Sequence, residues 1–268
     1  MSAFVPALRA LARPSVRRMV KPVVAQRTFV ATPRRFAARP AFMEKEQPRL
    51  RLGAVAPNFV AETTHGKLDF HQYIGDSWCI LFSHPADFTP VCTTELGAFA
   101  KLRPEFDARN VKLIGLSANG LAQHDEWVKD IDEVTGSAMH AGSDGSFPVI
   151  ADETREVAWL YDMVDQAQIE SLATAFTIRS VFIIDPAKKI RLVMTYPAST
   201  GRNTAEVLRV VDSLQTADKN GIATPVNWTA GEDVIVPPTV STQDAKKKFG
   251  ADNVRELKPY LRFTTLRK

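Results

Sequence analysis

Short apolar segments of strand length alternate with amphipathic helical segments through the middle of this chain, and this alternation restricts its fold more than any other feature. Residues 78–83 and 111–118 are apolar runs of strand length. Between them, apolar residues from about 91 to 109 recur at helical spacing, and a second helix is predicted over 123–134. The order strand, helix, strand, helix indicates an α/β domain.

The following segments add an antiparallel element to this pattern. Strands are predicted over 180–185 and 190–197, and the short Pro-Ala-Lys-Lys segment between them favours a hairpin. Asn203 then caps a helix, with Glu206 completing a capping box. The sequence therefore predicts a mixed sheet with helices on its faces.

The net charge of +4 is unevenly distributed along the chain. Residues 1–43 hold nine basic and no acidic residues, which leaves 25 of the 34 basic residues against all 30 acidic residues in the remainder. An Arg-rich, acid-free segment with interspersed apolar residues is typical of a mitochondrial transit peptide, with the matrix favoured over the intermembrane space. A basic tail that binds nucleic acid or anionic lipid is the alternative. We expect no nucleic-acid partner, and no run reaches the roughly twenty apolar residues of a membrane span.

Beyond this leader the chain divides into two parts. Residues 44–215 contain the predicted α/β domain, and from Thr216 the composition changes to short Pro-rich and Lys-rich segments. Residues 216–268 are therefore predicted to form a C-terminal module, which is too small to build a large core of its own.

The chain has two cysteines, Cys79 and Cys92, so a disulfide framework or a cysteine-rich metal site is not expected. Cys92 falls where a predicted helix begins, and the positive end of a helix favours the nucleophilic thiolate. Cys79 lies within an apolar strand, where a buried and inert thiol is favoured over a redox role. The five histidines are scattered without metal-ligand spacing, and we expect no metal.

The residues Pro85, Thr89 and Cys92 form a P-x-x-x-T-x-x-C pattern that resembles the peroxiredoxins, specifically the one-cysteine class related to peroxiredoxin six. The resemblance extends over about residues 47–268, through PADFTPVCTTEL, RNVKLIGLS, YPASTGRN and ATPVNW. It implies a thioredoxin-like fold and a thiol-dependent peroxidase that reduces hydrogen peroxide and organic hydroperoxides without a cofactor. It also implies a homodimer whose C-terminal arm packs against the partner near the active site.

The same resemblance implies a role for each residue around the thiol. Cys92 is the peroxidatic nucleophile, the hydroxyl of Thr89 orients peroxide and thiolate, and Arg179 donates hydrogen bonds to both. A guanidinium suits that task because it stays charged and holds several donors. Pro85, which lacks an N–H, is expected to shield the sulfur, and His84 resembles a histidine that forms hydrogen bonds near the thiolate.

Two further residues are predicted to support this site. Glu95 lies one helical turn after Cys92 and is expected to hold an arginine, and Arg202 is the candidate second arginine. No cysteine follows Cys92, so its sulfenic acid must be reduced by an external thiol. Glutathione, a glutaredoxin-like protein and a thioredoxin-like protein are the expected reductants.

Two other functions compete with peroxide reduction. Members of the same class are described as phospholipid hydrolases, but Cys79 replaces the last glycine of the G-x-S-x-G-like turn around Ser77. His71 stands where the class has its histidine, while Ala187 falls at the aspartate position and Asp185 lies two residues earlier. A nucleophile elbow also needs a strand before its serine, whereas here the strand follows. The third hypothesis is a non-catalytic chaperone or redox-signalling scaffold on the same fold.

Overall fold

A computed structural model describes residues 41–44 and 46–266 of the chain. Nearly all of the predicted leader, residues 1–40, lies outside this range. Ala41–Glu44 form a short 3-10 helix, η1, whose Phe42 and Met43 pack against the core. The predicted leader of 1–43 therefore overlaps the described fold by three residues. None of the helices in the described ranges is both long and apolar enough to cross a membrane.

The main sheet has seven strands in the order β2-β1-β5-β4-β3-β6-β7. The central strands β3, β4 and β5 run parallel, and β3 pairs with β6 in the antiparallel direction. Strands β6 and β7 form the antiparallel hairpin that the sequence predicted. The mixed sheet predicted from the sequence is confirmed. The strands are β1 Val60–Thr63, β2 Gly66–Asp69, β3 Trp78–Ser83, β4 Val111–Ser117, β5 Val149–Ala151, β6 Arg179–Ile184 and β7 Ile190–Tyr196.

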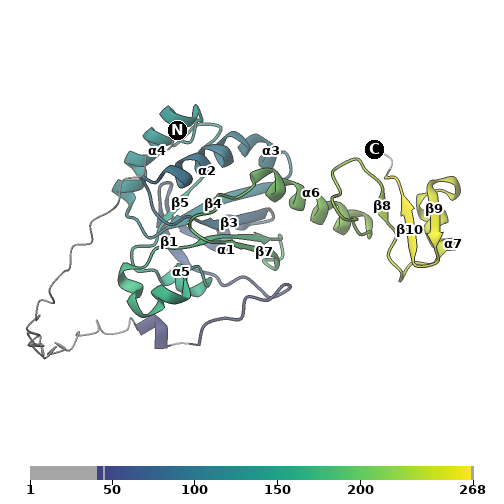
Figure 1. The fold of residues 1–268 in the computed structure, drawn as a ribbon, viewed down its shortest axis with the longest axis horizontal. Coiled ribbons are helices and arrows are strands. Elements are labelled where there is room, and N and C mark those ends of the chain that lie inside the picture. The colour runs from purple at the N-terminus through teal and green to yellow at the C-terminus, as the bar shows by residue number, and fades with distance from the viewer. Residues whose placement is uncertain (1–40, 45, 267–268) are drawn as a thin grey trace, which may run out of the picture. The chain divides into compact units, whose positions relative to one another are not determined.

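Helices cover both faces of this sheet (Figure 1). On one face, side chains of α2, α3, α4 and α6 form a hydrophobic cluster with Ile80 and Phe82 of β3. On the other, α1, α5 and the 3-10 helix η2 pack on Cys79 and Leu81. The elements are α1 Phe70–Ile74, α2 Pro90–Lys101, α3 Arg103–Asp107, α4 Leu121–Thr135, α5 Glu156–Leu160, η2 Gln166–Thr174 and α6 Thr204–Asn220.

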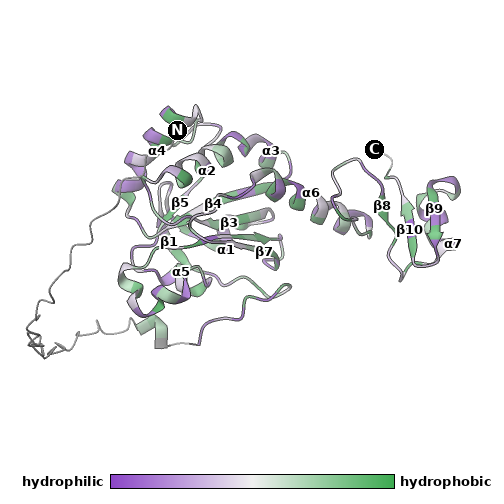
Figure 2. Ribbon diagram, in the orientation of Figure 1, coloured by the Kyte–Doolittle hydropathy of each residue, from purple (hydrophilic) through white to green (hydrophobic). Residues whose placement is uncertain are grey.

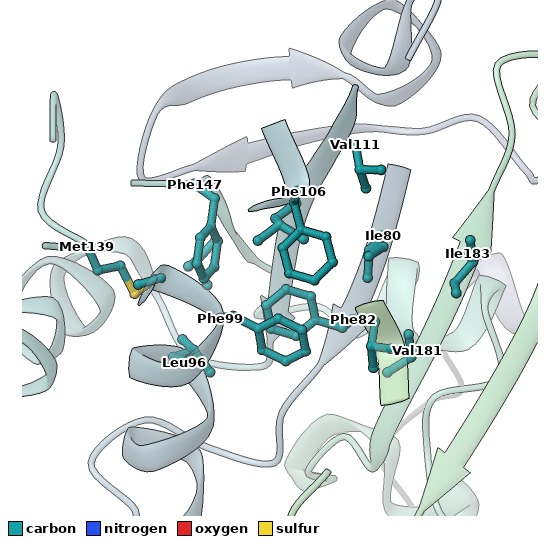
Figure 3. Packing of buried hydrophobic residues seen from close by; sticks show 14 of the residues in the cluster. Ile80, Phe82, Leu96, Phe99, Phe106, Val111, Met139, Phe147, Val181 and Ile183 are labelled. Atoms are coloured by element: carbon teal, nitrogen blue, oxygen red, sulfur yellow. The ribbon is translucent and has the colours of Figure 1, made fainter. Parts of the chain in front are cut away.

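Aromatic packing anchors α2 on the sheet. Figure 3 shows Phe82 of β3 beside Phe99 of α2, with ring centroids 4.4 Å apart and nearly parallel planes. Phe147 packs edge-on against Phe82 at 5.6 Å. Burial of such large apolar side chains is the main stabilising term here, about 1.5–3 kcal/mol for each. It fixes the helix whose first turn carries Cys92.

Helix α2 ends earlier than the sequence pattern predicts. The pattern favours a single helix from about 91 to 109, but the chain bends at Leu102 and continues as α3. Pro104 explains the break, because its ring lacks an N–H and would clash with the carbonyl of Ala100 in a continuous helix. Within α2, Gly97 permits close packing against α4, since a Cβ at this position would overlap the Thr135 side chain.

The C-terminal module forms a three-stranded sheet in the order β8-β10-β9. Helix α6 continues through Asn220, and Gly221 caps it in a left-handed conformation. The last helix of the main domain therefore ends about five residues after the domain boundary predicted at residue 215. In Figure 2 the main-sheet strands are largely hydrophobic, whereas α6 and α7 carry many hydrophilic residues. The elements are β8 Val234–Ile235, α7 Thr242–Phe249, η3 Ala251–Asn253, β9 Val254–Lys258 and β10 Leu261–Thr264.

Candidate active site

Cys92 is the third residue of α2 and is fully buried. Thr89 occupies the N-cap position and Pro90 is the first helical residue, where a missing N–H costs no helical hydrogen bond. The helix start predicted for Cys92 is therefore confirmed. The unpaired N–H groups of a first helical turn and the positive end of the helix favour an anion, here a thiolate.

Arg179 reaches this thiol from the first residue of β6. Its Nη1 lies 3.4 Å from the Sγ of Cys92 and 2.5 Å from Oε2 of Glu95. Nε and Nη2 donate to the carbonyl of Ala198, at 3.0 and 2.8 Å. Arg179 is 2% exposed, so its guanidinium acts on the sulfur in a site with little water to screen its charge. Arg179 therefore supplies a fixed positive charge beside Cys92.

Glu95 links this arginine to a second one. Arg202 donates from its backbone N and from Nε to Oε1 of Glu95, at 2.6 and 3.0 Å, and from Nη2 to Oε2 at 2.9 Å. Burial tends to raise the pKa of Glu95, but the charge and hydrogen bonds of Arg202, and then the charge of Arg179, hold it below its usual range. The carboxylate therefore stays ionised between two buried guanidinium groups.

Arg202 also ties this ion network to the sheet. Its Nη1 donates to the carbonyls of Ser83 at the end of β3 and Ser180 on β6. The guanidinium carbon lies 5.1 Å from the ring centroid of Phe82 and 5.6 Å from that of Phe99, in cation–π geometry. Glu95 and Arg202, predicted as supports, thus lie in one network with Arg179 and Cys92.

The loop between β3 and α2 places the two remaining motif residues. Pro85 is buried in this loop. Thr89 donates its hydroxyl hydrogen to the carbonyl of Ala86 at 2.8 Å, which leaves the oxygen lone pairs available as acceptors. The carbonyl of Thr89 accepts from the hydroxyl of Thr93, so the turn preceding Cys92 is held on both sides.

His84 belongs to a buried network that extends to α4. Its Nε2 lies 2.9 Å from Oδ1 of Asp87, and Oδ2 of Asp87 lies 2.5 Å from Nδ1 of His124. Burial opposes ionisation of Asp87, but hydrogen bonds from His124 and His84 lower its pKa to about 2. Burial is also the main cause that lowers the pKa of His84. His84 is therefore a neutral ring beside a carboxylate at neutral pH.

Sequence reasoning missed Asp87 and His124 as site residues. Asp87 lies inside the motif segment without a role implied by the motif, and His124 is one of the scattered histidines. The signal available in the sequence was spacing, because His124 precedes Trp127 by three residues and so falls on the same helix face. In the structure both residues are buried on the inner face of α4.

Cys79 lies on the opposite side of the sheet from Cys92. Its side chain packs with the cluster under α1 and α5, whereas Cys92 belongs to the cluster under α2 and α4. Cys79 is fully buried, and this burial raises the pKa of its thiol. A bond between the two sulfurs would need a rearrangement of the sheet, because disulfide geometry tolerates little displacement.

The residues of the phospholipid-hydrolase hypothesis are engaged elsewhere. The hydroxyl of Ser77 donates to Oδ1 of Asn110 at 2.7 Å, and Nε2 of His71 lies 2.7 Å from the carbonyl of Ala56. Asp185 accepts from the backbone N of Lys189 and forms an ion pair with Arg191. Ser77 also precedes β3 rather than following a strand, so the turn lacks the geometry of a nucleophile elbow.

Comparisons with known proteins agree with this geometry. The AhpC/TSA family matches residues 52–193, and the C-terminal domain of 1-Cys peroxiredoxin matches residues 213–251. The mitochondrial peroxiredoxin PRX1 of Saccharomyces cerevisiae is 57% identical over 225 residues, covering 83% of this chain and 84% of the yeast protein. Peroxiredoxin-6 of Rattus norvegicus is 51% identical over 219 residues, covering 80% of this chain and 97% of the rat protein.

Solved structures show the same fold. The yeast mitochondrial 1-Cys peroxiredoxin superposes with a TM-score of 0.72 at 54% identity, over 81% of this chain and 100% of that one. A cysteine-to-serine mutant of peroxiredoxin 6 from Arenicola marina gives a TM-score of 0.75 at 46% identity, over 82% of this chain and 100% of that one. These matches confirm the thioredoxin-like fold of the main domain and agree with the mitochondrial targeting predicted from the leader. The chain belongs to the 1-Cys peroxiredoxins, which are thiol peroxidases of the AhpC/TSA family.

Proposed function

We propose that Cys92 is the peroxidatic nucleophile of this peroxidase and that hydrogen peroxide and small organic hydroperoxides are its substrates. The observation that carries the proposal is the pairing of a first-turn thiol of α2 with a buried guanidinium 3.4 Å away. The thiolate attacks the terminal oxygen of the peroxide, the O–O bond breaks, and Cys92 becomes a sulfenic acid. The leaving oxygen departs as hydroxide or alkoxide and takes up a proton.

The proposal gives each surrounding residue a role in this reaction. Arg179 stabilises the thiolate and the developing oxyanion, because its fixed charge lies where negative charge moves. The hydroxyl of Thr89 accepts a hydrogen bond from the peroxide and so orients it. Pro85 keeps water from the sulfur, and His84 offers a hydrogen-bonding group near it. Glu95 and Arg202 support Arg179 by fixing its position.

The oxidised enzyme is reduced by an external thiol. The only other cysteine, Cys79, lies across the sheet from Cys92. An incoming thiol therefore attacks the sulfenic sulfur, releases water and forms a mixed disulfide that a second thiol cleaves. The solved yeast structure is described as revealing a thiol resolving mechanism through the glutathione and thioredoxin systems. Glutathione, with a glutaredoxin-like or thioredoxin-like protein, is the proposed reductant.

The proposed assembly is a homodimer in which the C-terminal arm packs against the partner near its active site. In support, β7 is the last strand of the seven-stranded sheet and has one strand neighbour, β6, among the described residues. An outer strand offers backbone groups for pairing with a second copy. Light scattering coupled to size exclusion tests this, since a monomer mass at micromolar concentration would contradict it.

The mature protein is proposed to reside in the mitochondrial matrix after cleavage before Ala41. In support, Phe42 and Met43 pack against the core, so their removal would expose apolar surface. Gln47 further ties this segment to the fold, because its amide donates to the carbonyl of Trp159 at 2.6 Å. N-terminal sequencing of the mitochondrial form is expected to begin at or before Ala41, and a start after Met43 would contradict the proposal.

The peroxidase assignment is tested by turnover with hydrogen peroxide and cumene hydroperoxide. Glutathione with glutaredoxin, and thioredoxin with its reductase, serve as alternative electron donors. Cys92→Ser is expected to reduce turnover to the uncatalysed background, whereas Cys79→Ser retains it. Retention of activity by Cys92→Ser would contradict the assignment, and an absence of peroxide turnover in the wild type would favour the scaffold hypothesis.

A further inference from the structure

Asp87 holds two imidazole rings that come from distant parts of the chain. His84 follows β3 and His124 lies in the first turn of α4, and their nitrogens meet the two carboxylate oxygens at 2.9 and 2.5 Å. The hydroxyl of Ser117 also donates to Oδ1 of Asp87, at 3.2 Å. All three members of the Asp87–His84–His124 network are at least 95% buried. A buried carboxylate this well supplied with donors is ionised and fixed in place.

The hydrogen bonds assign the proton on His84. Because an ionised carboxylate can only accept, Nε2 of His84 carries the hydrogen that faces Asp87. The ring is neutral, so its Nδ1 is a bare lone pair. This Nδ1 is fully buried and has no hydrogen-bond partner among the described residues. A buried acceptor without a partner is costly, and such groups cluster at functional sites.

His124 strengthens this assignment from the other side of Asp87. Its Nδ1 faces Oδ2 of Asp87 and its Nε2 lies 3.2 Å from the carbonyl of Ile150, so both ring nitrogens face oxygen acceptors. His124 therefore acts as a donor to Asp87 and leaves the carboxylate no freedom to rotate away from His84.

The ring with the bare nitrogen is linked to the segments on either side of Cys92. The carbonyl preceding His84, that of Ser83, accepts from Arg202, and the carbonyl of His84 accepts from the hydroxyl of Thr177. The His84 ring lies 5.0 Å from the Trp127 ring, centroid to centroid. Trp127 in turn donates its indole N–H to Thr93, the residue after Cys92. His84 is thus fixed to both the arginine side and the helix side of the Cys92 turn.

From these contacts we infer that Asp87 and His124 are positioning residues of the peroxidase reaction, which hold His84 in the tautomer whose bare Nδ1 accepts a hydrogen bond at the Cys92 site. The acceptor is available either to the thiol before ionisation or to the hydroxyl of the bound peroxide. The inference rests on the role proposed for His84, and it adds the reason that this histidine presents an acceptor rather than a donor.

Nitrogen-15 NMR of histidine-labelled full-length protein tests the tautomer without any substitution in the network. The His84 signals are assigned by their loss in His84→Gln. The inference predicts a protonated Nε2 and an unprotonated Nδ1 at pH 7. A proton on Nδ1, or on both nitrogens, would overturn it.

Rates of Cys92 oxidation test the positioning role. Each variant is mixed with hydrogen peroxide, quenched and analysed by mass spectrometry, which gives the second-order rate constant. We expect Asp87→Asn to lower this constant at least about tenfold, because a neutral amide cannot fix both rings as a carboxylate does. Asp132→Asn is the matched control, since Asp132 pairs with His140 at 2.8 Å away from the thiol. It is expected to stay within about twofold of wild type.

Two substitutions at His124 separate positioning from packing. His124→Asn keeps a side-chain N–H donor close to the place of Nδ1, whereas His124→Phe keeps the ring shape but removes the donor. A packing role predicts that the phenylalanine variant is the milder one. The positioning role predicts the reverse, with a rate for His124→Asn at least about threefold above that for His124→Phe. Equal rates would overturn the inference.

The outcomes also separate this inference from the proposal on which it rests. If His84→Gln slows Cys92 oxidation while Asp87→Asn and both His124 variants match wild type, the positioning role fails and the role of His84 stands. If His84→Gln itself matches wild type, the role proposed for His84 fails, and the inference fails with it. Neither result bears on Cys92 as the nucleophile.

Discussion

Nη1 of Arg179 lies 3.4 Å from Sγ of Cys92, although the two residues are 87 positions apart in the sequence. Strand β6 is hydrogen-bonded to β3, and α2 follows β3 through a short loop, so the sheet brings the charge to the thiol. Both residues are buried, so little water screens the attraction between the Arg179 charge and the sulfur of Cys92.

Arg179→Lys tests whether the planar shape of this cation matters as well as its charge. A lysine retains one positive charge but cannot reach the sulfur, Glu95 and the Ala198 carbonyl with fixed donors. We expect the rate constant for peroxide reduction to fall about 10²-fold. Arg191→Lys is the matched control, because Arg191 pairs with Asp218 at 2.6 Å on another part of the fold. Equal rates for the two variants would show that the site needs only a charge.

Glu95→Gln tests the carboxylate between the two arginines. The substitution leaves two buried guanidinium groups without the carboxylate that they share, and we expect a loss of about 3–5 kcal/mol in the free energy of unfolding at pH 7. The folded-state pKa of Glu95 is lowered, so its contribution to stability is present above its usual value of 4.5 and is lost as the pH falls below it. Urea unfolding at pH 7 and at about pH 3.5 should show that the difference in unfolding free energy between wild type and variant is smaller at the lower pH. A gap that is independent of pH would contradict this account.

The contribution of Asp152 to the free energy of unfolding is expected to change with pH in the opposite direction to that of Glu95. Its carboxylate is buried and accepts from the backbone N–H groups of Val157 and Ala158 at the start of α5. Burial is the main cause that raises its pKa from 3.8 to about 6. The contribution of Asp152 to the free energy of unfolding of the wild type therefore falls by an amount on the order of 3 kcal/mol as the pH rises from about 4 to about 6.

Asp152→Asn removes this titratable group, so a comparison of wild type and variant isolates the effect of its ionisation on the unfolding free energy. The difference in unfolding free energy between wild type and variant should shift in favour of the variant between about pH 4 and about pH 6.5, and stay constant above that. Chemical unfolding across this pH range measures it. A difference that moves in favour of the wild type over the same range would show that the ionised form is the better tolerated one.

The fold could be predicted from the sequence because β3 and β4 are almost continuous apolar runs of strand length, and the buried residues of α2 recur at helical spacing. The break at Leu102 depends on the clash of Pro104 with one carbonyl, which apolar periodicity does not register. Arg179, Arg202 and Glu95 were all predicted from the sequence, and the structure adds that the Glu95 carboxylate pairs with both arginines.

The network of Asp87 and His124 shows where sequence reasoning stops. The two residues are 37 positions apart, and their hydrogen bond forms only because α4 packs against the loop after β3. A histidine on the inner face of a helix is indistinguishable from a core residue until its neighbours are known. Tertiary packing, rather than local sequence, creates this part of the site.

The mass of the oxidised protein after one equivalent of hydrogen peroxide tests the central claim most directly. Trypsin leaves both cysteines in one peptide, residues 68–101, because Lys67 and Lys101 are the nearest cleavage sites. The one-cysteine mechanism predicts that this peptide gains one oxygen, or one trapped external thiol, and that fragmentation places the change on Cys92 with Cys79 unmodified. A loss of two hydrogens in the peptide, caused by a Cys79–Cys92 bond, would contradict the mechanism.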